Sequence, residues 1–476
     1  MSAVTSPDFK ANARAALGDR QLQRALSEVA PGLAARRSAA RAGLPEFEAL
    51  RDLGRDIKDH TLAHLDVCLE EFERKATAAG SIVHFAPTAE DARRIVRSIC
   101  RQANARVVTK GKSMISEEIG LNAALESDGL EVVETDLGEY LIQIRGETPS
   151  HIIAPAIHLT QDQVEADFRR LHTELPADRQ LIEPAQLVAE ARQILRQKFL
   201  AADVGITGAN FLIAETGSSV IVTNEGNGDL TQSLPKVHIV LASIEKMVPT
   251  LEDVSTLIRL LARSATGQEI STYTTFSTGP KRPADPDGPE ACHIVILDNG
   301  RAELLGGDFR EVLRCIRCGA CMNHCPVYTA IGGHAYGWVY PGPIGSVLTP
   351  ALIGVAKASH LPNASTFCGR CEEVCPMKIP LPGLMRHWRE EEFSAGDTPL
   401  LYRLGLRAWA AAARRPRLYH TLARVGVPLL ATLGRRRGAF RWLPLAGGWT
   451  RHRDLAAPQS RTFQALWEDH KAGVPR

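Results

Sequence analysis

The spacing of apolar positions changes twice along this chain. Up to Gly80, apolar residues recur at three- and four-residue intervals, as in "LPEFEALRDLGRDIKDHTLAHLDVCLEEFERKATAAG", and this spacing predicts helices. From Ser81, short β-rich runs alternate with helical stretches, which predicts an α/β domain with a largely parallel sheet. Beyond about residue 300 the periodicity gives way to a segment rich in cysteine, proline and glycine.

The helices of the middle part carry start signals in the sequence. Thr88 precedes a helical stretch with an acid three residues on, and "TQDQ" at Thr160 opens another. A long helix is predicted over roughly residues 182 to 203, and "LEDVSTLIRLLARSA" predicts a further one. In "ANFLIAETGSSVIVTNEGNG" we expect two strands joined by a tight turn at Thr216 to Ser218. The other runs expected as strands are SIVHFA, ARVVTK, LEVVETD, HIIAPAI, VHIVLASI, STYTTFST and ACHIVILDNG.

Composition and charge add little for the whole chain but more for its end. The chain has 476 residues, 44% hydrophobic and 23% charged, with a formal net charge of +2, so two to four globular units are expected. From Leu401 onward the sequence has fifteen Lys and Arg residues, and its acidic residues are only Asp454, Glu468 and Asp469. Four of the six tryptophans also lie in this part. An anionic surface, either a partner or the inner membrane face, suits such a segment, and a solvated helical face is the alternative.

The sequence shows no targeting or membrane-spanning segment. "MSAVTSPDFKANARAALGDR" has charged residues where a secretory signal is apolar, and the best apolar run, "VGVPLLATLG", is short and broken by Pro428. We therefore expect a soluble, cytoplasmic protein, peripheral at the inner membrane if its tail binds there. Seven of the ten cysteines fall in two tight groups, which in a reducing compartment favours metal binding over disulfides.

The first cysteine run, "CIRCGACMNHCP", has the spacing C-x2-C-x2-C-x3-C-P. This spacing lets three thiolates hold three corners of a cubane, while the fourth cysteine binds the other cluster in two-cluster ferredoxins. Gly319 removes bulk where the backbone approaches the cluster. Structural zinc sites use pairs of C-x2-C with a long spacer, so iron–sulfur is favoured over zinc.

The second run, "CGRCEEVCP", has the same ending but lacks one cysteine. Counting back three positions from Cys368 reaches Ser365, so a serine stands at the first corner. The fourth ligand of this cluster is then Ser365, water or another side chain, or the cluster has three irons. A single cluster on the first run, with zinc or nothing on the second, is the alternative. The crossed rule assigns cluster one to Cys315, Cys318, Cys321 and Cys375, and cluster two to Cys325, Cys368 and Cys371.

Motifs around these runs resemble those of the lactate utilization protein B family. They are "GACMNHCPVY", "HAYGWVYPGPIG" and "CEEVCPMKIPL", preceded by "TKGKSMISEEIGLN" and "AETGSSVIVTNEGNG". The resemblance covers nearly the whole chain, and the missing cysteine is itself a trait of the family. It implies a sugar-isomerase and CoA-transferase-like α/β domain over about residues 70 to 300. It also implies an iron–sulfur subunit of a bacterial system that oxidises L-lactate to pyruvate, with two partners: a second cysteine-rich iron–sulfur subunit and a smaller α/β relative.

Other residues offer weaker candidates for function. Lys110, Lys112 and Ser113 stand before a helix and could hold an anion, although a capped helix with solvated lysines explains them as well. Glu215 and Glu225 lie near tight turns, and CoA-transferase-like folds use a glutamate nucleophile, but turn formation alone accounts for that segment. His334 and Tyr336, between the cysteine runs, are expected near a cluster in packing or hydrogen-bonding roles, with His334 an alternative fourth ligand. The remaining thiols, Cys68, Cys100 and Cys292, are expected in the core.

The predicted fold is a sugar-isomerase/CoA-transferase-like α/β domain, an α-helical ferredoxin-like domain with two iron–sulfur clusters, and a helical basic tail. The leading hypothesis for function is electron transfer within an NAD-independent, quinone- or cytochrome-linked L-lactate dehydrogenase complex. One alternative makes the α/β domain the lactate-oxidising part, although "GNG" at Gly226 to Gly228 lacks the spacing of a dinucleotide site. An iron–sulfur sensor would need a further module that the sequence does not contain, and no nucleic-acid motif is present. The expected domains are 1–80 (helical), 81–300 (α/β), 301–392 (4Fe–4S) and 393–476 (basic tail).

Overall fold

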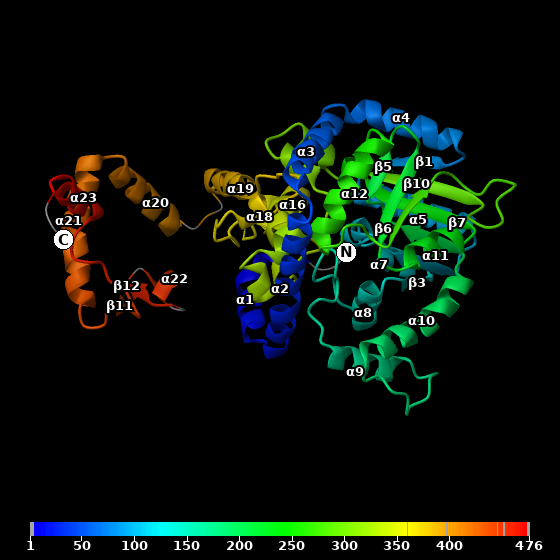
Figure 1. Ribbon diagram of the computed structural model, residues 1–476, viewed down its shortest axis with the longest axis horizontal. Coiled ribbons are helices and arrows are strands. Elements are labelled where there is room, and N and C mark those ends of the chain that lie inside the picture. Colours follow the sequence, from blue (N-terminus) through cyan, green and yellow to red (C-terminus); the bar gives the residue numbers. More distant parts are fainter. Residues whose placement is uncertain are drawn as a thin grey trace. The chain divides into compact units, whose positions relative to one another are not determined.

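The computed structural model describes residues 4–111, 113–358, 360–396, 398, 400–444, 446–450 and 453–473. The chain divides into two compact units, Met1–Glu392 and Phe393–Arg476. The first unit contains two sheets, the helices around them, the N-terminal helices and the cysteine-rich segment (Figure 1).

The larger sheet has six parallel strands in the order β1-β10-β7-β4-β2-β3. Its central strands are buried on both faces. In β10, Ile294 and Ile296 belong to one core, whereas Val295 and Leu297 belong to the core on the opposite face. Continuous apolar strands of this kind are typical of a parallel sheet covered on both sides. The strands are β1 (Ile82–Ala86), β2 (Val107–Gly111), β3 (Glu131–Glu134), β4 (Val204–Thr207), β7 (Val237–Ser243) and β10 (Ala291–Leu297).

Helices lie on both faces of this sheet. α5 and α7 contribute apolar residues to the core on one face, and α4 packs against the other. The predicted helix starts are confirmed: Thr88 Oγ1 accepts a hydrogen bond from the Asp91 N–H at 3.2 Å, and Thr160 with Gln163 forms a capping box. The helices are α4 (Leu65–Ala78), α5 (Ala89–Gln102), α6 (Met114–Glu118), α7 (Leu121–Glu126), α8 (Leu137–Arg145), α9 (Gln161–Leu171), α10 (Pro184–Ala201), α11 (Asn227–Ser233) and α12 (Leu251–Ala265).

A second, four-stranded sheet has the order β8-β5-β6-β9. The predicted hairpin is confirmed, since β5 and β6 pair antiparallel across a turn that contains Gly217 at φ +69°. A Cβ on Gly217 would lie 2.2 Å from the Ala76 backbone nitrogen, so only glycine fits this turn. The strands are β5 (Phe211–Ile213), β6 (Ser218–Thr223), β8 (Met247–Val248) and β9 (Tyr273–Ser277), with the 3-10 turn η2 (Ile244–Lys246) before β8.

The strand predicted at HIIAPAI is wrong, because the described residues there form bends and turns. His151 Nδ1 accepts hydrogen bonds from the N–H groups of Ile153 and Ala154, at 3.1 and 3.2 Å. These N–H groups are therefore used within the loop, and Pro155 has none to offer. The segment serves instead as a wall for the cysteine-rich segment.

The cysteine-rich segment and the N-terminal helices share one core. Leu50 and Ile57 of α3 belong to the same buried cluster as Met377 and the cysteine thiols. A Cβ on Gly54 of α3 would lie 2.7 Å from a Leu260 side-chain atom of α12, so these helices approach closely. Figure 1 shows α1 to α3 (blue) beside the cysteine-rich segment (yellow). The elements are η1 (Ser6–Asp8), α1 (Phe9–Gly18), α2 (Arg20–Ala42), α3 (Phe47–Ala63), α13 (Arg301–Leu305), η3 (Arg310–Arg314), α14 (Ala320–Asn323), α15 (Tyr328–Ile331), η4 (His334–Tyr336), α16 (Gly342–Ile353), α17 (Val355–Ala358), α18 (Arg370–Glu373) and α19 (Leu381–Ala395).

The second unit is built mainly from helices with exposed apolar side chains. α20 buries none of its described residues, and α21 exposes a row of apolar residues at three- and four-residue spacing. Among the described residues, no helix has both the length and the apolar character needed to cross a membrane. The elements are α20 (Leu400–Ala413), α21 (Pro416–Gly434), β11 (Ala439–Phe440), α22 (Gly447–Thr450), β12 (Leu455–Ala456) and α23 (Phe463–Lys471).

Candidate functional site

The seven predicted thiols line two small cavities in the cysteine-rich segment. Cys375 from the second run lines the cavity of the first run, and Cys325 from the first run lines the cavity of the second. Each cavity is therefore lined by thiols from both cysteine runs. The first cavity is lined by Cys315, Cys318, Cys321 and Cys375, and the second by Cys325, Cys368, Cys371 and Ser365.

The backbone turns of the two runs are alike. Arg317 and Phe367, each directly before a cysteine, have φ values of +60° and +53°, and Gly319 and Gly369, directly after it, have +73° and +79°. The left-handed conformation is costly for residues with a Cβ, so two such residues at matching positions indicate a turn that the surrounding structure holds in place. At Gly319 an added Cβ would also lie 3.0 Å from His151. In both runs a short helix, α14 or α18, follows the turn.

Ser365 lies in the turn of the second run as Cys315 lies in that of the first. The Arg317 N–H donates to Cys315 Sγ at 3.4 Å, and the Phe367 N–H donates to Ser365 Oγ at 3.1 Å. The structure thus gives the same local position to the thiol and to the hydroxyl. Ser365 is the residue that counting along the sequence placed at the first corner.

The two sets of thiols differ in their exposure. Cys318, Cys321 and Cys375 of the first set are buried, and Cys315 is half-buried. In the second set Cys371 and Cys325 are buried, but Cys368 is exposed. The second cavity therefore has a thiol at the protein surface, whereas the thiols of the first cavity are buried or half-buried.

The donor set fits an iron–sulfur group. Burial and the neighbouring Cys375 raise the pKa of the Cys318 thiol to about 12, and burial and Cys325 raise that of Cys371 to about 12. Thiolates packed this closely in an apolar site are stabilised only by a positively charged partner such as iron. Soft sulfur donors in groups of three and four are the ligands that iron–sulfur clusters use.

Tyr336 lies beside both sets of thiols. Its pKa is raised well above the usual value by burial and by the nearby Cys325 and Cys321, and its hydroxyl has no hydrogen-bond partner among the described residues. A buried hydroxyl of this kind is suited to donate to a sulfur atom of a bound cluster. Neither Tyr336 nor His334 lines the cavities themselves, and His334 Nε2 lies 2.7 Å from the Thr148 carbonyl oxygen.

Residues from the N-terminal helices hold the second cysteine run. Arg37 of α2 donates to the Val374 carbonyl oxygen at 2.6 Å. Arg51 of α3 donates to the carbonyl oxygen of Cys375 at 2.7 and 3.1 Å, and to that of Glu373 at 3.0 Å. The first eighty residues therefore support the site directly, a role that the sequence did not indicate.

The loop that follows α8 supports the first cysteine run. Because His151 Nδ1 accepts hydrogen bonds, its Nε2 carries the proton and donates to Asn323 Oδ1 at 3.1 Å. Burial lowers the pKa of His151 to about 4, so the ring is neutral at neutral pH. Tyr328 OH also donates to the Ser150 carbonyl oxygen at 2.7 Å. The α/β part and the cysteine run are thus joined by buried, directed contacts.

A buried chain of charges runs from the α/β part to Cys315. Arg301 donates to both carboxylate oxygens of Glu118, at 2.7 and 3.0 Å, and Tyr340 OH donates to Glu118 at 2.7 Å. Arg301 Nε lies 2.9 Å from Glu245 Oε2, as an ion pair without hydrogen-bond alignment. Burial opposes ionisation of Glu245, but Arg301 and Arg317 lower its pKa to about 2. Arg317 completes the chain, with Nη2 3.1 Å from Glu245 Oε1.

At the candidate anion site before α6, Lys110 is already bound to side chains of the protein itself. Lys110 is buried, donates to Ser116 Oγ at 2.6 Å and Glu117 Oε1 at 2.8 Å, and pairs with Glu134 at 2.6 Å. The expectation of a solvated lysine was wrong at this position, because Lys110 and Glu134 are register partners in β2 and β3. Ser113 caps α6, and Lys112 lies outside the described residues.

The glutamates proposed as nucleophiles are exposed and line none of the cavities found near the sheets or the thiols. Glu215 Oε2 accepts a hydrogen bond from the Leu251 N–H at 3.1 Å, at the start of α12, and Glu225 has partners of its own. Turn formation and helix capping therefore account for this segment. The three remaining thiols are buried, as predicted: Cys68, Cys100 and Cys292.

Three family models match the chain in succession. They are the LUD domain over residues 69–297, the 4Fe-4S dicluster domain over residues 311–379, and the C-terminal model of lactate utilisation protein B over residues 392–472. The matched dicluster segment contains all seven thiols of the two cavities. The dicluster match and the donor set together identify residues 311–379 as an iron–sulfur binding segment.

Similar proteins extend over nearly the whole chain. The lactate utilization protein B of Bacillus licheniformis is 41% identical over 470 residues, which is 98% of this chain and 98% of the relative. That of a Geobacillus species is 43% identical over 440 residues, or 92% of each chain. Among solved structures, a DUF162 family protein from Deinococcus radiodurans matches 49% of this chain and 98% of its own, with 16% identity and a TM-score of 0.28.

Proposed function

The chain belongs to the lactate utilization protein B family, and we propose that it is an iron–sulfur protein that transfers electrons during the oxidation of L-lactate to pyruvate. The observation that carries this proposal is the pair of cavities, each lined by thiols from both cysteine runs. Two neighbouring clusters with interlocked ligands are an arrangement used for electron transfer.

We propose two clusters with crossed ligands. Cys315, Cys318, Cys321 and Cys375 would hold a [4Fe–4S] cluster in the first cavity. Cys325, Cys368 and Cys371 would hold the second cluster, as [4Fe–4S] with Ser365 or another oxygen donor, or as a three-iron cluster. Bound clusters supply one-electron acceptors and donors. The chain's own contribution is to bury the first site and to place hydrogen-bond donors near the sulfur atoms.

We infer that electrons leave or enter through the second site. Cys368 is exposed, so a partner can approach this cluster closely. The first set of thiols faces the α/β part through Arg317, whose backbone N–H lies on Cys315. A path from an enclosed site to a surface site suits a relay within a larger assembly. The proposed partners are a second cysteine-rich iron–sulfur subunit and a smaller α/β relative.

We also propose the role of the remaining parts. The α/β part (81–300) would be of the sugar-isomerase/CoA-transferase-like type, and the cysteine-rich part (301–392) would be ferredoxin-like. The basic C-terminal part (393–476) would place the protein at an anionic surface, the inner membrane face being preferred over a partner. Its exposed apolar side chains and excess of arginine support this assignment.

Iron and sulfide analysis of anaerobically purified protein, with EPR of the reduced form, tests the proposal. About seven or eight irons per chain and two magnetically coupled signals are expected, whereas about four irons would contradict the crossed arrangement. The rival hypothesis makes the α/β part itself the lactate oxidase. If the purified, reconstituted chain alone oxidised L-lactate with an artificial acceptor, electron transfer would not be its main role.

A further inference from the structure

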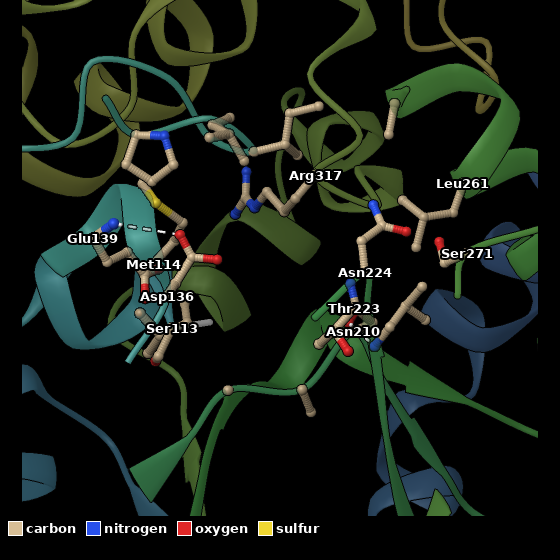
Figure 2. A pocket seen from close by; sticks show the side chains of 18 of the residues that line it. Ser113, Met114, Asp136, Glu139, Asn210, Thr223, Asn224, Leu261, Ser271 and Arg317 are labelled. Carbon is tan, nitrogen blue, oxygen red and sulfur yellow. Dashed lines mark hydrogen bonds between the residues drawn. The ribbon is translucent and has the colours of Figure 1, made fainter. Parts of the chain in front are cut away.

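A cavity of about 170 Å³ lies at the carboxyl ends of the parallel strands. Its walls come from the residues that directly follow β2, β3, β4 and β7, and from β6, α12 and the loop that contains Ile152. In open parallel sheets this edge is where ligands bind. Figure 2 shows Arg317 reaching into the space between Asp136 on one side and Asn224 on the other. Among the expected functional residues of the α/β part that the structure describes, Ser113 alone lines it.

Arg317 connects this cavity with the first set of thiols, because it lines both spaces. It is 9% exposed, and its Nη1 has no hydrogen-bond partner among the described residues. Nη2 pairs with Glu245, and the guanidinium carbon lies 4.7 Å from the centre of the Tyr340 ring. The arginine is thus held on one side and has a free donor on the other. Buried donors without partners are rare, and one on a cavity wall is available to a bound molecule.

Lys246 adds a second positive charge to the cavity wall. It is 7% exposed, ends the turn η2 that follows β7, and makes no hydrogen bond or ion pair among the described residues. The neighbouring carboxylate of Glu245 is already paired with Arg301 and Arg317. A buried, unpaired ammonium is costly, and an anion close to it removes that cost.

The rest of the lining is polar and apolar, and it includes the carboxylates of Asp136 and Glu139, both of which have partners within the protein. Asn210 uses its carbonyl oxygen to accept a hydrogen bond from the Val222 N–H at 2.8 Å, so its amide group remains a donor. Leu261 and Ile152 supply apolar wall, and the Asp136 carboxylate accepts hydrogen bonds from the first N–H groups of α8. A cavity of about 150 Å³ holds benzene, so this one suits a molecule of about six to eight non-hydrogen atoms.

We propose that this cavity binds a small organic carboxylate, such as a 2-hydroxy or 2-oxo acid, with its carboxylate on Arg317 and Lys246. The ligand class follows from two buried cations, one amide donor and an apolar wall in a space of this size, since the two carboxylates of the lining, Asp136 and Glu139, already have partners. The choice of L-lactate and pyruvate as probes rests on the proposed function. Because Arg317 also contacts Cys315, the bound anion neutralises positive charge beside the first cluster site. Binding therefore lowers the reduction potential of that cluster, and reduction of the cluster weakens binding by the same factor.

Calorimetric titration of the anaerobic holoprotein with pyruvate, L-lactate and inorganic phosphate tests this inference. Saturable binding of at least one of the two carboxylates is expected, with phosphate at least tenfold weaker. Lys246→Gln should weaken carboxylate binding by tenfold or more, and Lys246→Arg should restore most of it. The matched control is Lys236→Gln, which makes the same change at an exposed lysine and should bind as the wild type does. A second variant, Ala265→Val, narrows the cavity without changing a charge and should also weaken binding.

Three results would overturn the inference: no saturable carboxylate binding to the wild type, equal binding by the wild type and Lys246→Gln, or phosphate binding as tightly as the carboxylates. An EPR-monitored redox titration with saturating ligand should move the potential of one cluster to a more negative value, and an unchanged potential contradicts the coupling through Arg317. Iron content and EPR of the same samples test the proposed function separately. A two-cluster protein without carboxylate binding would remove this inference alone.

Discussion

Ser365 occupies the position in the second cysteine run that Cys315 occupies in the first. Each side-chain atom accepts a hydrogen bond from the backbone N–H two residues later, at 3.1 Å for the hydroxyl and 3.4 Å for the thiol. Each also lines a cavity with cysteine thiols. The backbone turn that would present a fourth ligand is therefore present in both runs. At this position the second run has the Ser365 hydroxyl oxygen where the first run has the Cys315 sulfur.

Replacing Ser365 with cysteine should complete the second ligand set. We expect Ser365→Cys to bring the iron content to about eight per chain and to give the second cluster the EPR signature of a four-thiolate [4Fe–4S] centre. Ser365→Ala shows whether the hydroxyl is a ligand, because it should change that signature only if Oγ binds iron. Ser98→Cys adds a thiol on the exposed side of α5 and serves as the control. An unchanged signature in Ser365→Cys would contradict the equivalence with Cys315.

Removing the Tyr336 hydroxyl should lower a cluster potential. A hydrogen bond to a cluster sulfur stabilises the reduced state, so Tyr336→Phe should make the potential more negative by about 20–60 mV, equivalent to about 0.5–1.5 kcal/mol. EPR-monitored redox titration measures this shift. Tyr328→Phe is the matched control, since that hydroxyl donates to the Ser150 carbonyl oxygen. Equal potentials for Tyr336→Phe and the wild type would show that the hydroxyl does not contact a cluster.

Breaking the buried ion pair should destabilise the first unit strongly. Glu118→Gln leaves the fully buried Arg301 without its bidentate partner, and such changes cost about 3–5 kcal/mol. The urea midpoint of the anaerobic holoprotein, followed by circular dichroism, is expected to fall clearly. Glu90→Gln is the control: it removes an exposed pair with Arg93, and the midpoint should hardly change. Comparable shifts in both variants would argue against a structural role for the buried pair.

Stability should decrease in acid partly because of His238. This histidine is buried, burial lowers its pKa to about 4, and its Nε2 lies 2.8 Å from Thr207 Oγ1. Between pH 6.5 and 4 the His238 ring binds a proton in the unfolded chain but stays neutral in the folded chain. The free energy of unfolding therefore falls as the pH drops from 6.5 toward 4. The slope is at most about 1.4 kcal/mol per pH unit.

The difference between His238→Gln and the wild type isolates this effect, because acid lability of the clusters affects both proteins. Urea unfolding between pH 7 and 4.5 should show a smaller loss of stability for the variant. His60→Asn, on an exposed position of α3, is the control. Parallel curves for His238→Gln and the wild type would rule out the buried histidine as a source of the pH dependence.

The apolar row on α21 should bind an anionic bilayer. The exposed members at three- and four-residue spacing are Leu418, Leu422, Val425, Leu429 and Leu433, and three arginines follow the helix. The full chain should sediment with phosphatidylglycerol vesicles, less so in high salt. The double variant Leu422→Ser, Leu429→Ser should bind at least tenfold more weakly, because each leucine contributes about 1.5–3 kcal/mol. Leu17→Ser, at an exposed leucine of α1, is the control. No sedimentation at low salt would exclude the membrane in favour of an acidic partner.

The sequence predicted those features that depend on local spacing. Thr88 and Thr160 mark helix starts because a capping contact spans three residues, and Ser365 follows from counting within a C-x2-C turn. The hairpin around Gly217 was predicted for the same reason. In each case the partners are a few residues apart, so the pattern is visible without the fold.

Features that depend on distant partners could not be predicted. Glu118 and Arg301 are 183 residues apart, and the segment TKGKSMISEEIGLN that contains Glu118 does not indicate its partner. Lys110 was expected in solvent because its partner Glu134 becomes a neighbour only through the register of β2 and β3. Arg317 was merely a spacer residue within the cysteine motif, yet its positive φ and its contact with Glu245 direct it into the α/β cavity. Spacing alone gives no sign of such a role.

The hydrogen bonds from Arg37 and Arg51 to the second cysteine run have a consequence for biosynthesis. On the ribosome, Arg51 is made 324 residues before Cys375, whose carbonyl oxygen it holds. Cys375, the last of the proposed cysteine ligands, therefore emerges long after the helices that position it. We expect the helices and the sheet to fold first and to form the surface against which the cysteine-rich segment then packs. Iron delivery would then be among the final steps of maturation, and chains truncated at the N-terminus should remain colourless.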